Sequence, residues 1–120
     1  MAEREKGINS LLTRGDLCHV ILWTGLLNGD NGSPLQMPGS ADRSVQVSGT
    51  FGSGGNLRIE GSNDGSNFVV LSDPQGNALD ITSASIKMVM EVTRYIRPRV
   101  TSGNGSTDLT VTMIVRRVTK

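Results

Sequence analysis

The chain contains one cysteine and one histidine, Cys18 and His19, the residue types that most readily supply a nucleophile and a base. Both lie in a segment with the composition of a β-strand, where neighbouring side chains point to opposite faces. They therefore cannot form a nucleophile–base pair with each other. A catalytic site needs reactive groups that converge, and with these two kept apart we expect no enzyme activity.

The acidic residues are mostly isolated in turn-like sequence, as at Asp30, Asp64 and Asp108. Aspartates in turns usually accept hydrogen bonds from their own backbone. Residues 28–31, Asn-Gly-Asp-Asn, do not match the spacing of a calcium loop, and the sequence has no His/Cys cluster of the kind that binds zinc. The glycine-rich residues 49–55 lack a following lysine and join two expected strands, which argues against a phosphate loop. We expect no metal and no cofactor.

Basic residues gather late in the chain, where Arg97 and Arg99 share one face of an expected strand with Tyr95. Such a face is usually solvated, or it forms salt bridges with another protein. We expect no nucleic-acid binding by this face, because single-stranded sites combine basic groups with several exposed aromatics. The formal net charge of +1 also supplies no general attraction to nucleic acid or to a membrane surface.

The elements that would hold these residues are short strands. Alternating apolar residues recur from residue 43 onward, separated by turns rich in Gly, Asn and Asp, with no long helical pattern. The Asp64-Gly65 pair between two alternating segments predicts a β-hairpin. Met88, Met90 and Val92 form one apolar face. Pro98 lacks a backbone donor, which predicts an edge position or a bulge for its strand. The pattern indicates an all-β domain, an antiparallel sandwich or barrel of seven to eight short strands.

The sequence divides into an N-terminal arm, residues 1–16, and a β-sandwich domain, residues 17–120. The arm is polar except for Ile8, Leu11 and Leu12, which suit either a frayed terminus or a segment that orders on a neighbouring subunit. Residues 17–25, which include Trp23, are apolar on both strand faces, so we expect a second cover from the arm or from another subunit.

Residues 28–40 form a long loop that contains Leu35 and Met37. These two apolar side chains either contact a partner or fold back over the domain's own core. The single cysteine excludes an internal disulfide and fits a reducing compartment. Residues 1–6 lack the apolar core of a signal peptide, and no apolar run reaches the length of a membrane span.

Residues 44–117 resemble small structural proteins of tailed bacteriophages. The resemblance rests on the segments Val47-Ser48-Gly49-Thr50-Phe51-Gly52, Leu57 to Phe68, Arg94-Tyr95-Ile96-Arg97-Pro98 and Gly103 to Thr107, followed by a last apolar strand into Arg116-Arg117. It implies a capsid decoration (cement) protein in the virion, bound to the capsid surface. The implied partners are the major capsid protein and other copies of itself. A component of the head–tail junction or of the tail is the alternative.

A second resemblance is to discoidin-type domains, carried by Gly61-Ser62-Asn63-Asp64-Gly65 and Arg94-Tyr95-Ile96-Arg97. It implies a jelly-roll-like sandwich and, as an alternative function, a carbohydrate-binding module. A sugar site would need an exposed aromatic platform, which only Trp23 or Tyr95 could supply. Across both resemblances, the candidate interface residues are Ile8, Leu11, Leu12, Trp23, Leu35, Met37, Tyr95, Arg97 and Arg99.

Overall fold

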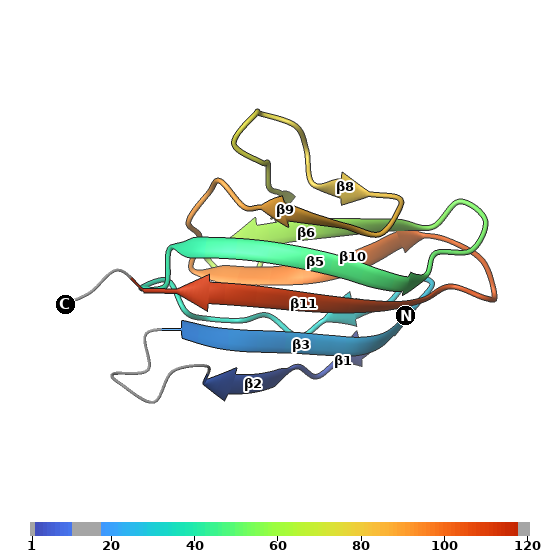
Figure 1. Cartoon of the computed structure of the whole chain (residues 1–120), viewed down its shortest axis with the longest axis horizontal. Helices are drawn as coiled ribbons and strands as arrows, with labels where there is room; N and C mark the ends of the chain where they lie inside the picture. Colours follow the sequence, from blue (N-terminus) through green and yellow to red (C-terminus); the bar gives the residue numbers. More distant parts are fainter. Residues whose placement is uncertain (1, 11–17, 118–120) are drawn as a thin grey trace.

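The computed structural model describes residues 2–10 and 18–117, and these fold into two packed β-sheets without a helix (Figure 1). Sheet A contains β1 (Glu3–Arg4), β4 (Asn31–Gly32), β6 (Asn56–Ser62), β7 (Val69–Val70), β8 (Asp80–Ile81) and β10 (Tyr95–Ser102). Sheet B contains β2 (Gly7–Ser10), β3 (Cys18–Leu27), β5 (Asp42–Thr50), β9 (Ser85–Met88) and β11 (Asp108–Arg116). The predicted all-β sandwich is confirmed. No helix capable of crossing a membrane occurs in this described part of the chain.

The strand order is that of a jelly roll. The main strands of sheet B follow the order β3-β11-β5-β9, while β4, β10 and β6 lie side by side in sheet A and β8 pairs with β6. Taken along the chain, the strands cross repeatedly between the two sheets, so each sheet is assembled from segments distant in sequence. This arrangement of eight strands is the one that two Greek keys produce.

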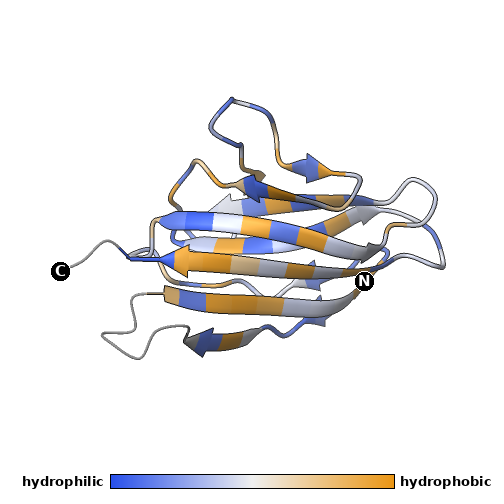
Figure 2. Cartoon of the chain, in the orientation of Figure 1, coloured by the Kyte–Doolittle hydropathy of each residue, from blue (hydrophilic) through white to orange (hydrophobic). Residues whose placement is uncertain are grey.

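The core lies between the sheets and is built from alternate residues of the long strands. Figure 2 shows this alternation as bands of hydrophobic and hydrophilic colour along β5, β10 and β11. Residues of one parity point inward and are buried, because successive side chains of a strand point to opposite faces. The fully buried apolar residues include Ile21, Trp23, Val45, Val47, Leu57, Ile59, Ile96, Val100, Leu109, Val111, Met113 and Val115.

The described part of the predicted arm belongs to the sandwich. Strand β1 pairs in parallel with β4, and β2 pairs antiparallel with β3, so residues 3–10 supply an edge strand to each sheet. A boundary at residue 16 therefore does not separate a projecting arm from the domain over residues 2–10. Leu11 and Leu12 lie outside the described residues.

Pro98 lies in the interior of sheet A, not at its edge, because β10 is flanked by β4 and β6. The backbone N–H groups of Ile96 and Val100 both donate toward the β4 side, to Leu35 and Asp30. Because backbone N–H directions alternate along a strand, the nitrogen of Pro98 also faces β4, next to Gly32. A proline at this position therefore removes no hydrogen bond to β6. The strand also carries the expected irregularity, a register shift between Val100 and Ser102.

Candidate protein-interaction surface

The outer face of sheet A brings Arg97 and Arg99 together around one buried carboxylate. Glu60 is 2% exposed and lies 3.1 Å from Nη2 of Arg97 and 3.5 Å from Nη1 of Arg99. Beside them, Arg58 pairs with Asp80 at 2.9 Å. The three guanidinium groups thus meet two carboxylates of their own sheet, Glu60 and Asp80. We interpret this face as a solvated network that is largely compensated within the sheet, with one positive charge in excess.

Tyr95 begins β10 and is half-buried. The guanidinium of Arg94 lies 5.2 Å from the centre of its ring, and that of Arg97 lies 3.9 Å from the ring centre of Phe68. One face of each of these two rings is therefore covered by a cation of the same chain. Tyr95 consequently offers little of the open platform that stacking of a sugar requires.

Trp23 and Leu35 lie inside the core, with exposed fractions of 0% and 1%. The indole N–H of Trp23 donates to the carbonyl of Ser33 at 3.0 Å, and Leu35 forms a β-bridge with Ile96. Met37 is half-buried against the same core. Of the two interpretations of the loop, the structure supports the one in which it closes over its own domain. Trp23 and Leu35, which were candidate interface residues, are therefore not available to a partner.

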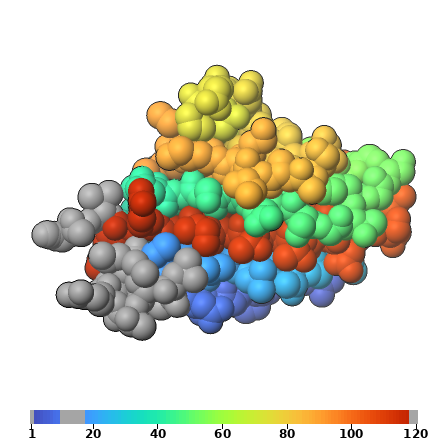
Figure 3. Space-filling model, in the orientation of Figure 1, coloured from blue at the N-terminus to red at the C-terminus, as the bar shows by residue number. Residues whose placement is uncertain are grey.

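Sheet B presents a different outer face, which we call the front face and which Figure 3 shows as bands from β3 through β11 and β5 to β9. Cross-strand partners share a face of a sheet. One row of such partners contains Val20, Ile114, Ser44 and Met88, and the next contains Leu22, Thr112, Gln46 and Ile86. Neither row includes a charged residue, so the middle of the front face is uncharged and largely apolar.

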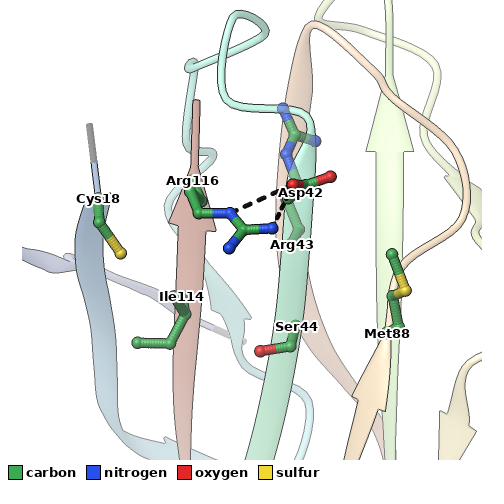
Figure 4. Close-up of a pocket in the computed structure, with 7 residues that line it drawn as sticks. All are labelled: Cys18, Asp42, Arg43, Ser44, Met88, Ile114 and Arg116. Atoms are coloured by element: carbon green, nitrogen blue, oxygen red, sulfur yellow. Dashed lines mark hydrogen bonds and ion pairs between the residues drawn. The ribbon is translucent and has the colours of Figure 1, made fainter. Parts of the chain in front are cut away.

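A hollow of about 410 Å³ lies at one end of the front face, bordered by β3, β11, β5 and β9 (Figure 4). Its walls include Cys18, Ile114 and Met88. At its end, Nη2 of Arg116 donates to Asp42 at 2.8 Å, and this contact raises the pKa of the guanidinium above its ordinary value. Because those two charges satisfy each other, the remaining lining is suited to an apolar group.

Arg43 borders the hollow only through its position on β5, because its side chain points to the other side of the strand (Figure 4). Its guanidinium is buried and donates to the carbonyls of Ser40, Met37 and Thr93. Burial lowers the pKa of this group. We interpret Arg43 as a structural residue whose hydrogen bonds hold together the loops at this end of the sandwich.

Exposed apolar residues continue from the front face along the edge of sheet B. Ile86, Met88, Met90 and Val92, which we call the β9 stripe, have exposed fractions of 64%, 49%, 59% and 51%. Val89, between them, is 2% exposed and packs in the core. The sequence pattern predicts one apolar face from Met88, Met90 and Val92. The structure leaves all three in solvent, because it is Val89 that turns inward.

At the opposite edge of the same sheet, β2 and β3 expose Ile8, Leu22 and Leu27, with fractions of 49%, 36% and 42%. Strand β2 ends the order of sheet B, so one side of its backbone meets no other strand among the described residues. Such an edge can accept a further strand or a partner's loop. Among the predicted apolar candidates that the structure describes, Ile8 is therefore the one classed as exposed.

Cys18 and His19 remain apart in the structure. Cys18 lines the hollow on the front face, while His19 pairs with Val115, whose side chain is in the core, so the two point to opposite sides as expected. No group of three or more His, Cys, Asp or Glu side chains that could hold a metal ion occurs in the part of the chain that the structure describes. The surface features that stand out are apolar, and they lie on strands and on the segment that follows β9.

Fold and surface together define a class: a jelly-roll β-sandwich with large exposed apolar side chains on sheet B and its edges and, on sheet A, at Val69 and Val70 of β7. Among solved structures, the chain is similar to SPBc2 prophage-derived protein YomS, with a TM-score of 0.63 and 14% sequence identity. The match covers 89% of this chain and 98% of that one, and at this identity it shows a shared fold. No protein-family profile and no curated protein sequence matches the chain.

Proposed function

We propose that this chain is a non-catalytic structural protein of a tailed-phage virion, which binds the outside of the capsid and braces subunits of the major capsid protein. Two observations support the phage context: the resemblance of residues 44–117 to phage structural proteins, and the shared fold with a prophage-derived protein. The observation that carries an adhesive role is the exposure of large apolar side chains on the strands of sheet B and at its edges.

Strand-borne apolar residues suit adhesion because a sheet holds them rigidly, so little conformational entropy is lost when a partner covers them. A standard protein interface buries roughly 1,600 Å². A chain of 120 residues can offer about half of that from one face, and such contacts become strong in effect when many copies bind a symmetric shell.

For the shell contact we propose the edge formed by β2 and β3. Ile8 and Leu22 supply apolar area there, and the outer side of β2 supplies backbone donors and acceptors that meet no strand among the described residues. Ile8 shares the inward side of the sheet with its partner Ile21, and Leu22 lies on the outer side. A strand of the shell protein could pair with the β2 backbone and cover Ile8 with side chains of one face and Leu22 with those of the other. The compensated face of sheet A would then remain in solvent.

The test uses phage shells that lack this protein and the purified full-length chain. Co-sedimentation should show saturable binding, and cryo-electron microscopy of the loaded shells should place density at capsomer junctions. Ile8→Lys and Leu22→Lys should each weaken binding about tenfold or more, as loss of a central apolar contact does. Thr101→Lys, on the outer face of sheet A, is the matched control and should leave binding unchanged.

Failure to bind shells while binding isolated tails or head–tail connectors would move the protein to the alternative virion position. Absence of the protein from purified virions, measured by mass spectrometry, would refute a structural role in the particle. Loss of binding in the Thr101→Lys control alone would place the contact on sheet A instead of on the β2–β3 edge.

A further inference from the structure

The β9 stripe and the hollow form a projection and a recess that lie side by side on one molecule. Met90 and Val92 project into solvent with exposed fractions of 59% and 51%, and the hollow that begins at Met88 has Ile114 and Cys18 in its walls, beside Ser44 and the Asp42–Arg116 pair. Met90 does not fill the hollow of its own chain, because its side chain is exposed while its N–H is bonded to the carbonyl of Ser72. A projection next to a matching recess is the basic requirement of a two-fold symmetric contact.

The charge of this surface also favours an uncharged, apolar occupant. The two central rows of the front face contain no ionisable side chain, and Asp42 and Arg116 at the end of the hollow neutralise each other. A strongly acidic or basic partner would gain no attraction here and would lose hydration. A second copy of the same face carries no net charge and meets this requirement.

The sequence of the stripe is itself symmetric about Val89. Reversing the direction of residues 86–92 exchanges Ile86 with Val92 and Met88 with Met90, which are pairs of similar size. Two stripes that cross antiparallel at Val89 would therefore place Met90 of one copy beside Met88 of the other. Since Met88 is a wall of the hollow, the same crossing directs Met90 into the partner's recess.

We propose that two copies of this chain associate through their front faces, about a two-fold axis near Val89, with Met90 of each copy in the hollow of the other. The four strands of the front face, spaced about 4.8 Å apart and on average about 26 Å long, give about 1,000 Å² of flat surface for the two copies together. That area is at the lower limit for a specific interface, so the dimer is weak in solution and strengthened by local crowding on a particle. The inference goes beyond the proposed shell contact and uses a different edge.

Cysteine cross-linking tests the contact directly, in a Cys18→Ser background because Cys18 is the only cysteine. The proposed crossing places Met90 of one copy beside Met88 of the other, whereas Cys18 lies on β3, three strand spacings or about 14 Å from the line of β9. A Met88→Cys chain mixed with a Met90→Cys chain therefore brings these two thiols together between copies. A short bis-maleimide joins them, because each thiol adds across one maleimide double bond and no oxidant is needed.

The mixture of Met88→Cys and Met90→Cys should give a covalent dimer, severalfold more abundant than in a mixture of Met88→Cys with Gln75→Cys, a matched exposed control. Peptide mapping should identify the 88–90 linkage between copies. By sedimentation velocity, Met90→Lys should weaken the dimer about tenfold or more, and Met90→Leu should preserve it. Position 90 is exposed, so none of these variants is expected to unfold the domain.

A native chain that remains monomeric into the millimolar range would overturn the proposal, as would cross-linking in the mixture of Met88→Cys and Met90→Cys no greater than in the mixture with Gln75→Cys. A monomer that loses shell binding on Met90→Lys would also overturn it and would assign the stripe to the shell protein. Ile8→Lys separates the two surfaces, because it should leave the dimer intact while weakening the shell contact; Leu22 lies in the front face and does not separate them.

Discussion

Asp30 holds the N-terminal segment against the sandwich through hydrogen bonds. Substituting Asp30 measures how much these bonds contribute to the free energy of unfolding. The carboxylate is 4% exposed and accepts three hydrogen bonds, from the N–H of Ala2 at 3.1 Å, the N–H of Leu27 at 2.9 Å and Nε of Arg4 at 2.8 Å. The bonds to Ala2 and Arg4 hold β1 against β4. Asp30→Ala removes all three bonds and should destabilise the fold while loosening the first strand.

The expected cost follows from the kind of each bond. Two backbone donors that lose a charged acceptor cost roughly 1–2 kcal/mol each, and the Arg4 pair, whose guanidinium is partly exposed, adds about 0.5 kcal/mol. Asp30→Ala should therefore lower the free energy of unfolding by about 3 kcal/mol. Asp30→Asn keeps one acceptor oxygen without the charge and should lose about half of that.

Urea unfolding measures this cost, with the fluorescence of Trp23 as the probe, since it is the only tryptophan and is fully buried. Hydrogen exchange adds a local reading: the N–H groups of Asn31 and Ser33 donate to Ala2 and Arg4, so their protection should fall in Asp30→Ala. A loss below about 1 kcal/mol, or unchanged protection at these two amides, would refute the assignment of Asp30 as the anchor.

The pH dependence has a definite sign. Burial alone would raise the pKa of Asp30, but the bonds from Leu27, Arg4 and Ala2 outweigh it and hold the pKa below its ordinary value of 3.8. A depressed carboxyl pKa contributes stability that is present above the unfolded value and is lost as the pH falls through the folded value. The difference between the native chain and Asp30→Ala should therefore persist at neutral pH and shrink in acid, below the ordinary carboxyl range.

Three further substitutions test other parts of the sandwich by the same urea titration. Gly32→Ala should cost about 1–3 kcal/mol, because the new Cβ would lie 2.6 Å from the ring of Pro98; full stability would contradict the close approach of β4 to β10. Glu60→Gln should cost about 1–3 kcal/mol, since it leaves Arg97 without its buried carboxylate partner, and a neutral result would show that solvent compensates this cation. Met113→Ala should cost about 2–5 kcal/mol by opening a cavity in the core, unless the two sheets collapse to fill it.

Much of the fold could be predicted from the sequence, because inward-facing residues of the long strands repeat with period two. Val45 and Val47 are both fully buried, as their alternation with polar residues indicates. The Asp64-Gly65 hairpin signal also succeeded, since the turn joins β6 and β7 and Gly65 has a φ of +84°. These features depend on local backbone chemistry, which a single sequence contains.

The exposure of the β9 stripe could not be predicted in the same way. Residues 86–92 are apolar at every even position and again at Val89, so their pattern allows either side to face the core. The choice is made by register: β9 pairs with β5 such that Val89 donates its N–H to Arg43 and joins the inward set. A pairing between strands about forty residues apart leaves no trace in local periodicity. For the same reason, the sequence pattern did not show that Trp23 is buried by its own domain.

The two outer faces of this sandwich explain why adhesion, if it occurs, should use sheet B. On sheet A, each of Arg58, Arg97 and Arg99 meets a carboxylate within its own sheet, so a partner that covered these pairs would pay for their dehydration and gain little new attraction. On sheet B, the exposed groups are apolar and already poorly hydrated, so covering them releases water at little cost. The same chain therefore presents one face that favours solvent and one that favours contact, which is the asymmetry a protein needs to sit on a surface with a defined side outward.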